Sequence, residues 1–147
     1  MNNTSDFEQL FNTMLQLGKL VSQQTQESHD ERTATILQFS ALNFIKEQPS
    51  ATVSDLAMPL LLSKSSATQL VERLVKLGLV ERANDPDDRR IIRLSITSNG
   101  EKEFSTLRNI MLEKMKRIFS KLPAKDTREL IRIHMNLIEA LKKEQNG

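Results

Sequence analysis

The sequence predicts a mainly α-helical protein with one small β-hairpin. Apolar residues recur every three or four positions over most of the 147 residues, which is the spacing of amphipathic helices. β-Branched residues with partial alternation are confined to two short runs, 79–82 and 91–96. Proline, glycine and short polar clusters separate these segments. A chain of this length suits one domain, which we expect to span residues 1–147.

Two helices are expected before residue 50. Ser5 to Glu8 form a capping box that opens the first helix, and residues 23–28 continue it as a polar extension. Its apolar positions are Leu10, Phe11, Met14, Leu17 and Val21. The second helix is expected over residues 33–46 and ends before Pro49. The polar residues around His29 predict a solvated turn between the two helices.

Residues 52–78 predict two further helices joined by a tight connection. Thr52 to Asp55 resemble a capping box, and Pro59 is expected to end this first, brief helix. Ser63 is placed to cap the second helix, and Gly78 is placed to end it. One apolar stripe runs along the second helix through Ala67, Leu70, Val71 and Leu74. This arrangement predicts a helix-turn-helix.

The polar side of the second helix carries groups that can bind DNA. Hydroxyls, an amide and cations near a helix N-terminus can bind base edges and phosphates. Any solvent-exposed helix face carries similar residues, so this helix alone does not decide between DNA binding and simple solvation. The candidate DNA-binding residues are Lys64, Ser65, Ser66, Thr68, Gln69 and Arg73.

The hairpin strengthens the DNA-binding interpretation. Its turn, residues 83–90, holds three aspartates followed by two arginines. We expect Asp88, or a neighbouring aspartate, to hold Arg90 extended, in a pose that suits the narrow and strongly negative minor groove of A·T-rich DNA. The alternative is a self-neutralised turn in water, which would contribute little. The candidate residues of this wing are Asp88, Arg89 and Arg90.

The segment 50–101 resembles the MarR family of winged-helix transcription regulators. The matching positions are Leu56-Ala57, Ser63, Thr68, Leu70-Val71, Arg73-Leu74, Gly78-Leu79-Val80, Arg82, Asp85-Pro86, Asp88-Arg89-Arg90, Leu94, Thr97 and Gly100. The resemblance implies a winged helix-turn-helix over 32–97, with its recognition helix in the major groove and Arg90 in the minor groove. It also implies an intertwined homodimer, released from DNA by small molecules bound between the dimer helices and the winged domain.

That ligand crevice would draw on the first, second and fifth helices. Its candidate residues are Leu17, Val21, His29, Arg32, Phe39 and Phe104. Phenylalanine could accept an apolar ligand body, and His29 or Arg32 could meet an anion. Each of these residues taken singly is explained as well by ordinary packing.

The two ends of the chain, residues 5–31 and 98–147, are expected to be mainly dimerisation helices. Helical spacing of apolar residues continues over 97–122, Pro123 interrupts it, and a last helix is expected over 125–143. These helices have more apolar surface than one small winged-helix core can cover. A second copy related by a two-fold axis is the simplest partner, although the helices could instead fold back on one another in a monomer.

Composition argues against other classes of protein. The net charge of +2 favours a few well-placed cations over a broad basic surface. The chain has no cysteine, no apolar run near 20 residues and no signal-peptide pattern, so we expect a cytoplasmic protein without membrane spans. Its two histidines are far apart and it has only four glycines, so we expect no metal site, cofactor or enzymatic activity.

The sequence therefore predicts a dimeric, sequence-specific DNA-binding regulator, more specifically a repressor that binds pseudo-palindromic double-stranded DNA and is released by a small-molecule effector. The alternative is a winged-helix module that contacts another protein without binding DNA. Salt dependence separates the two, because DNA binding falls steeply as salt rises.

Overall fold

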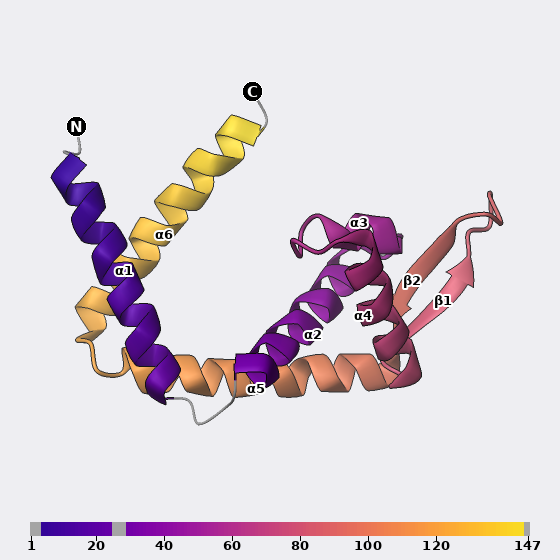
Figure 1. The fold of residues 1–147 in the computed structure, drawn as a ribbon, viewed down its shortest axis with the longest axis horizontal. Helices are drawn as coiled ribbons and strands as arrows, with labels where there is room; N and C mark the ends of the chain where they lie inside the picture. Colours follow the sequence, from indigo (N-terminus) through magenta and orange to yellow (C-terminus); the bar gives the residue numbers. More distant parts are fainter. Residues whose placement is uncertain (1–3, 25–28, 146–147) are drawn as a thin grey trace. The chain divides into compact units, whose positions relative to one another are not determined.

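The computed structural model describes residues 4–24 and 29–145, which contain six α-helices and one two-stranded sheet (Figure 1). In chain order the elements are α1 (Thr4–Gln24), α2 (His29–Glu47), α3 (Val53–Ala57), α4 (Lys64–Lys76), β1 (Val80–Asn84), β2 (Ile92–Ile96), α5 (Ser98–Phe119) and α6 (Ala124–Gln145). The predicted helical fold with one hairpin is confirmed. The chain divides into two compact units after residue 109, so α5 contributes to both. None of the described helices has the length and apolarity needed to cross a membrane.

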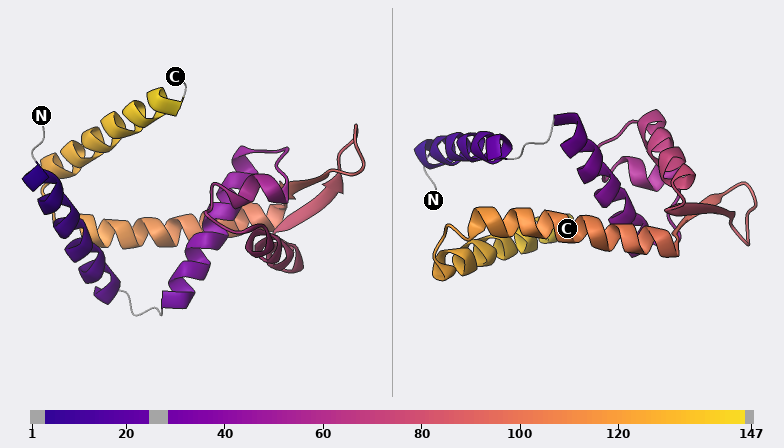
Figure 2. Two further views of the ribbon diagram at one scale, coloured as in Figure 1. Left: turned by 45° about the horizontal axis from the view of Figure 1, so that its top comes forward. Right: turned by 90° about the horizontal axis from the view of Figure 1, so that it is seen from below.

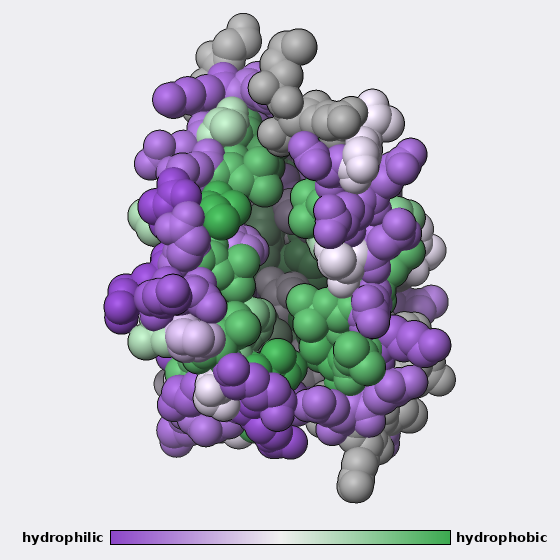
Figure 3. Space-filling view, turned by 90° about the vertical axis from the view of Figure 1, so that its left-hand side faces the viewer, coloured by the Kyte–Doolittle hydropathy of each residue, from purple (hydrophilic) through white to green (hydrophobic). Residues whose placement is uncertain are grey.

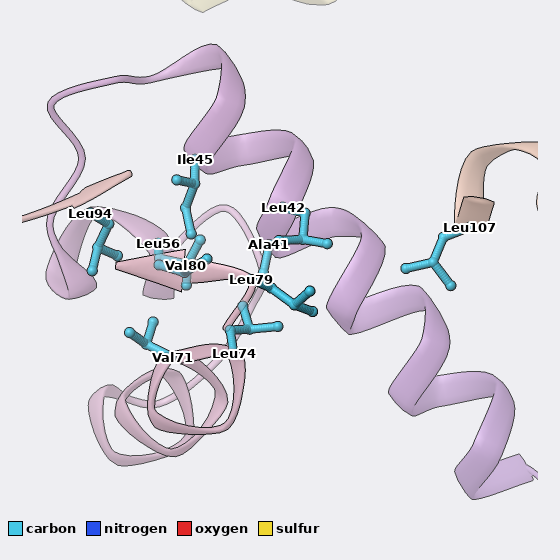
Figure 4. Close-up of a cluster of buried hydrophobic side chains, with 10 residues drawn as sticks. All are labelled: Ala41, Leu42, Ile45, Leu56, Val71, Leu74, Leu79, Val80, Leu94 and Leu107. Atoms are coloured by element: carbon cyan, nitrogen blue, oxygen red, sulfur yellow. The ribbon is translucent and has the colours of Figure 1, made fainter. Parts of the chain in front are cut away.

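The first unit has a hydrophobic core built by α2, α3, α4 and the hairpin. Leu42 and Ile45 of α2, Leu56 of α3, Leu74 of α4 and Leu94 of β2 are all 0–1% exposed. Figure 4 shows the side chains from these elements directed toward one another. Burying such side chains stabilises the fold by about 1.5–3 kcal/mol each. This core fixes α4 and the hairpin on one support.

The predicted caps of the helix-turn-helix are confirmed. The Thr52 hydroxyl accepts the Asp55 N–H and the Asp55 carboxylate accepts the Thr52 N–H, which completes a capping box before α3. The Ser63 hydroxyl accepts the Ser66 N–H at 3.1 Å and starts α4. Gly78 follows α4 with a φ of +71°, the left-handed conformation that ends helices. The ends of α4 are therefore set by short-range chemistry.

The wing is longer on its first strand than the sequence predicted. Ala83 and Asn84 were expected in the turn, but they pair with Arg93 and Ile92 in the antiparallel ladder. The strand continues because β2 offers ladder partners this far along. Figures 1 and 2 show the hairpin projecting away from α2, α3 and α4.

Two predicted helix starts are corrected. The described part of α1 begins at Thr4, so Ser5 lies inside the helix and does not cap it. α2 begins at His29 instead of residue 33, so the expected solvated turn around His29 is helical. Polar residues can occupy helix ends as readily as turns, which is why the pattern did not separate the two. The expected polar extension over 25–28 lies outside the described residues.

The connection between α3 and α4 contains a strained residue. Leu61 has a φ of +55°, although its side chain is 93% exposed and gains little from packing. Replacing Leu61 with asparagine is expected to stabilise the protein by about 1 kcal/mol, because asparagine tolerates this conformation better. Urea unfolding measures the change. The control is Met58→Asn, at a neighbouring exposed position with right-handed backbone, which should shift stability by less than about 0.5 kcal/mol. An equal gain in both variants would contradict the strain explanation.

Candidate nucleic-acid interface

The N-terminal turn of α4 presents a cluster of hydroxyl groups. Ser63 Oγ lies 2.9 Å from Ser66 Oγ and 3.1 Å from Ser65 Oγ. All three residues are exposed, and the free N–H groups of a helix start favour an anion nearby. Thr68 donates its hydroxyl to the Lys64 carbonyl at 2.9 Å, which leaves its oxygen able to accept a hydrogen bond. This end of α4 can therefore bind phosphates and base edges.

The rest of α4 separates a buried side from an exposed one. Ala67, Val71 and Leu74 are buried in the core. Gln69 is exposed on the opposite side, as expected from its position in the sequence. Arg73 is also exposed, but it borders a pocket of about 310 Å³ shared with α2 and α5. Lys64, Ser65, Ser66, Thr68 and Gln69 are thus exposed in the first half of α4, while Arg73 lies farther along the helix, on the same flank as Ser66.

The wing turn holds one arginine in a defined pose. Asp88 accepts hydrogen bonds from Arg90 Nε at 3.0 Å and from Arg90 Nη2 at 2.9 Å, and its Oδ1 also accepts the Arg90 N–H. The predicted Asp88–Arg90 contact is confirmed. The Arg90 side chain is nevertheless 89% exposed, so much of the guanidinium surface remains accessible. The contact orients the cation without burying it.

Electrostatics keep this pair charged at neutral pH. Hydrogen bonds from the Arg90 side chain, and then from its N–H, lower the pKa of Asp88 below its usual range. The Asp88 carboxylate raises the pKa of Arg90 in turn. Arg89, the third predicted wing residue, is exposed beside them. The wing therefore presents cations in a form suited to a negative groove.

A second aspartate organises the start of the wing turn. Asp85 accepts the N–H groups of Asp87 and Asp88 at 2.9 and 3.0 Å, and it accepts Arg93 Nε at 2.7 Å. The bond from Arg93 is the main reason that the pKa of Asp85 is lowered, and the two N–H groups add to it. Sequence reasoning did not select Asp85 or Arg93 as site residues. Arg93 stands between two apolar residues of β2, and this interruption was the available signal.

Five of the six residues predicted for a ligand crevice, namely Leu17, Val21, Arg32, Phe39 and Phe104, are not among those that line the pocket beside Arg73. Phe39 and Phe104 stack with their ring centroids 5.1 Å apart and pack against the core. Arg32 donates to Ser22 Oγ at 3.0 Å, Leu17 is half exposed and Val21 is partly buried. The side chain of His29 lies outside the described part of the structure. The pocket is lined instead by Glu31, Ala34, Thr35, Gln38, Arg73, Glu103 and Leu107.

A capped recognition helix beside a hairpin that presents an oriented arginine defines a winged-helix DNA-binding protein. Residues 33–91 match the model of the MarR family. The multiple antibiotic resistance protein MarR of Escherichia coli K12 is 30% identical over 107 residues, which cover 68% of this chain and 72% of that protein. The chain belongs to the MarR family of transcriptional regulators. The curated relatives align with it over about half to three quarters of their own length.

Solved structures of similar fold cover nearly the whole chain. The multiple antibiotic-resistance repressor MarR from Listeria monocytogenes 4b F2365 has a TM-score of 0.61 at 25% identity, and the match covers 97% of this chain and 98% of that one. The transcriptional regulator PcaV from Streptomyces coelicolor, solved in complex with its natural ligand, has a TM-score of 0.57 at 19% identity and 90% coverage of this chain, 91% of its own. The second likeness concerns the fold alone. Members of the MarR family are transcriptional regulators and not enzymes, so the chain is a DNA-binding transcriptional regulator and not an enzyme.

Proposed function

We propose that this protein is a homodimeric repressor that binds a pseudo-palindromic DNA site and is released by a small-molecule ligand. Each copy places the N-terminal half of α4 in the major groove and Arg90 in the adjacent minor groove. The main observation that supports this proposal is the way in which Arg90 is held. It is oriented by Asp88 through three hydrogen bonds and yet is 89% exposed.

The apolar faces of α1 and α6 support the homodimer. Neither helix contains a buried residue. Half-exposed apolar side chains on α1 are Phe7, Leu10, Phe11, Met14, Leu15, Leu17 and Leu20, and those on α6 are Ile131, Ile133, Met135, Leu137, Ile138 and Leu141. Figure 3 shows many hydrophobic side chains exposed at the surface, with hydrophilic side chains beside them. Surfaces of this kind mark interfaces, and a two-fold pair covers both copies at once.

Two relatives and one pocket support the proposal that the protein is a repressor released by a ligand. The Listeria relative is called a repressor, and PcaV was solved with its natural ligand. In this chain the pocket of about 310 Å³ joins Arg73 of the recognition helix to Gln38 of α2 and Glu103 of α5. A molecule bound there would contact the helix that reads DNA and the two helices that support it. Such a ligand can shift α4 only if it binds more tightly to the protein with α4 in one position than to the protein with α4 in another.

Selection of bound duplexes from a random pool by the purified protein is the first experiment. Two related half-sites about one helical turn apart are expected, with A·T pairs where the wings lie. Affinity for the selected duplex should fall steeply with salt. Recovery of no preferred sequence, or binding that ignores salt, would contradict DNA recognition and favour a protein-contact role for the winged helix.

Arg90→Ala is expected to weaken binding to the selected duplex by about 10- to 100-fold, or about 1–3 kcal/mol. The loss should be smaller on a duplex that has G·C pairs at the wing steps, because the narrow A·T groove strengthens the contact. Fluorescence anisotropy at several salt concentrations measures both. The control is Arg108→Ala, which removes one exposed cation of α5 outside the recognition helix and the wing. If both variants lose the same affinity, Arg90 acts only through net charge.

A further inference from the structure

Arg93 connects the turn of the wing to the segment that precedes α3. It is the second residue of β2, next to the turn of the hairpin, and its Nε donates to Asp85 Oδ2 at 2.7 Å while its Nη1 donates to the Ser50 carbonyl at 2.5 Å. The side chains of Arg93 and Asp85 are 33% and 12% exposed, compared with 89% for Arg90. Arg93 is therefore committed to contacts within the chain, whereas Arg90 is presented to solvent.

The contacts of Asp85 extend from Arg93 to the wing tip. Its other carboxylate oxygen accepts the N–H groups of Asp87 and Asp88, which shapes the turn between the strands. Asp88 then holds Arg90 through both carboxylate oxygens. A continuous series of hydrogen bonds thus runs from the Ser50 carbonyl through Arg93, Asp85 and Asp88 to Arg90.

The other end of this series is tied to the recognition helix. Ser50 is followed by Ala51, whose carbonyl accepts the Leu94 N–H at 2.8 Å. Thr52 then caps α3, and α3 packs against α4. Arg93 therefore lies where β2 contacts the segment that leads into the helix-turn-helix. A planar guanidinium suits this place, because its fork of donors serves two acceptors in a fixed relation, which the single ammonium of lysine does not.

We propose that Arg93 is a positioning residue that sets where Arg90 lies relative to α4, and so which minor-groove step the wing reads beside the major-groove contact. The inference rests on the proposed minor-groove role of Arg90. Arg93 itself does not contact DNA in this arrangement. Its effect on binding must therefore pass through Arg90, and that dependence can be measured.

A double-mutant cycle tests the dependence. Arg93→Gln is expected to weaken binding of the full chain to the selected duplex about 3- to 10-fold, less than Arg90→Ala does. The double variant should bind like Arg90→Ala alone. The control pair is Arg82→Gln with Arg90→Ala, because Arg82 is an exposed β1 cation whose side chain makes no hydrogen bond or ion pair among the described residues. The losses in binding free energy caused by these two substitutions should add in the double variant.

A second readout separates positioning from general stability. Arg93→Gln should reduce the preference for A·T over G·C pairs at the wing steps, while the preference within the α4 half-site stays unchanged. Arg93→Lys, which keeps the charge, should recover part of the lost preference. If Arg93→Gln does not fold, the cycle is run with Arg93→Lys, whose thermal unfolding is recorded alongside.

Additive losses for the Arg93 and Arg90 changes would overturn the inference, as would an equal loss of preference in both grooves. Failure of the proposed function gives a different result, because Arg90→Ala by itself would then leave affinity and A·T preference unchanged. The two failures are therefore distinguishable in one set of measurements.

Discussion

Gly100→Ala is expected to destabilise the DNA-binding unit by about 3 kcal/mol. A Cβ atom at this position would lie 2.1 Å from the Leu79 carbonyl oxygen and 2.6 Å from Ile96 Cγ1. The Leu79 oxygen also accepts the Thr97 N–H at 3.0 Å, which joins the start of the wing to the start of α5. Because the Leu79 oxygen is a backbone atom, the clash is relieved only if the segment that leads into β1 moves away from the start of α5. The expected loss of stability is therefore at the upper end of the range that is usual for overpacking.

Urea unfolding of the purified variant, followed by circular dichroism, measures this loss. Gly18→Ala is the control, because Gly18 lies within α1 and has no atom within 4 Å of its Cβ position. It should raise stability by about 0.5–1 kcal/mol through helix propensity. A Gly100→Ala protein as stable as the parent would show that Leu79 and α5 can separate freely.

Most of the fold could be predicted from short-range patterns. Ser63 and Thr52 cap their helices as expected because an N-cap needs only one hydroxyl and the next three residues. Gly78 ends α4 for a similarly local reason. The pairing of Asp88 with Arg90, two residues apart in a turn, is local too. Features that depend on neighbouring residues were therefore accessible from the sequence.

Features that depend on distant residues were not accessible in the same way. Arg93 reaches Ser50, 43 positions earlier, and no spacing rule relates the two. Arg73 shares a helical flank with DNA-binding candidates, but its surroundings come from α2 and α5. Phe39 and Phe104 were expected beside a ligand, and their stacking partner could be identified only once α2 and α5 were placed. Tertiary contacts thus decided the details of the site.

Ile138→Glu is expected to separate the proposed dimer and, with it, to abolish tight binding to two half-sites. Ile138 is half exposed on α6, on the same stripe as Ile131 and Met135. A two-fold interface contains each change twice, so a cost of about 2 kcal/mol for each carboxylate weakens the pair by about 4 kcal/mol. That corresponds to nearly a thousandfold in the dimer dissociation constant.

Sedimentation equilibrium and DNA titration distinguish this effect from unfolding. The parent is expected to sediment at twice the chain mass, and Ile138→Glu at the chain mass with its helical circular dichroism retained. Asn136→Glu is the control, because it adds the same charge to an exposed position on the opposite side of α6 and should leave the mass unchanged. A monomer binds one half-site with the contacts of one α4 and one wing, so the variant should lose affinity only where two half-sites are present. A parent that sediments as a monomer while still binding the paired site tightly would contradict the two-fold arrangement, because the two half-sites would then be read without a joined pair of recognition helices.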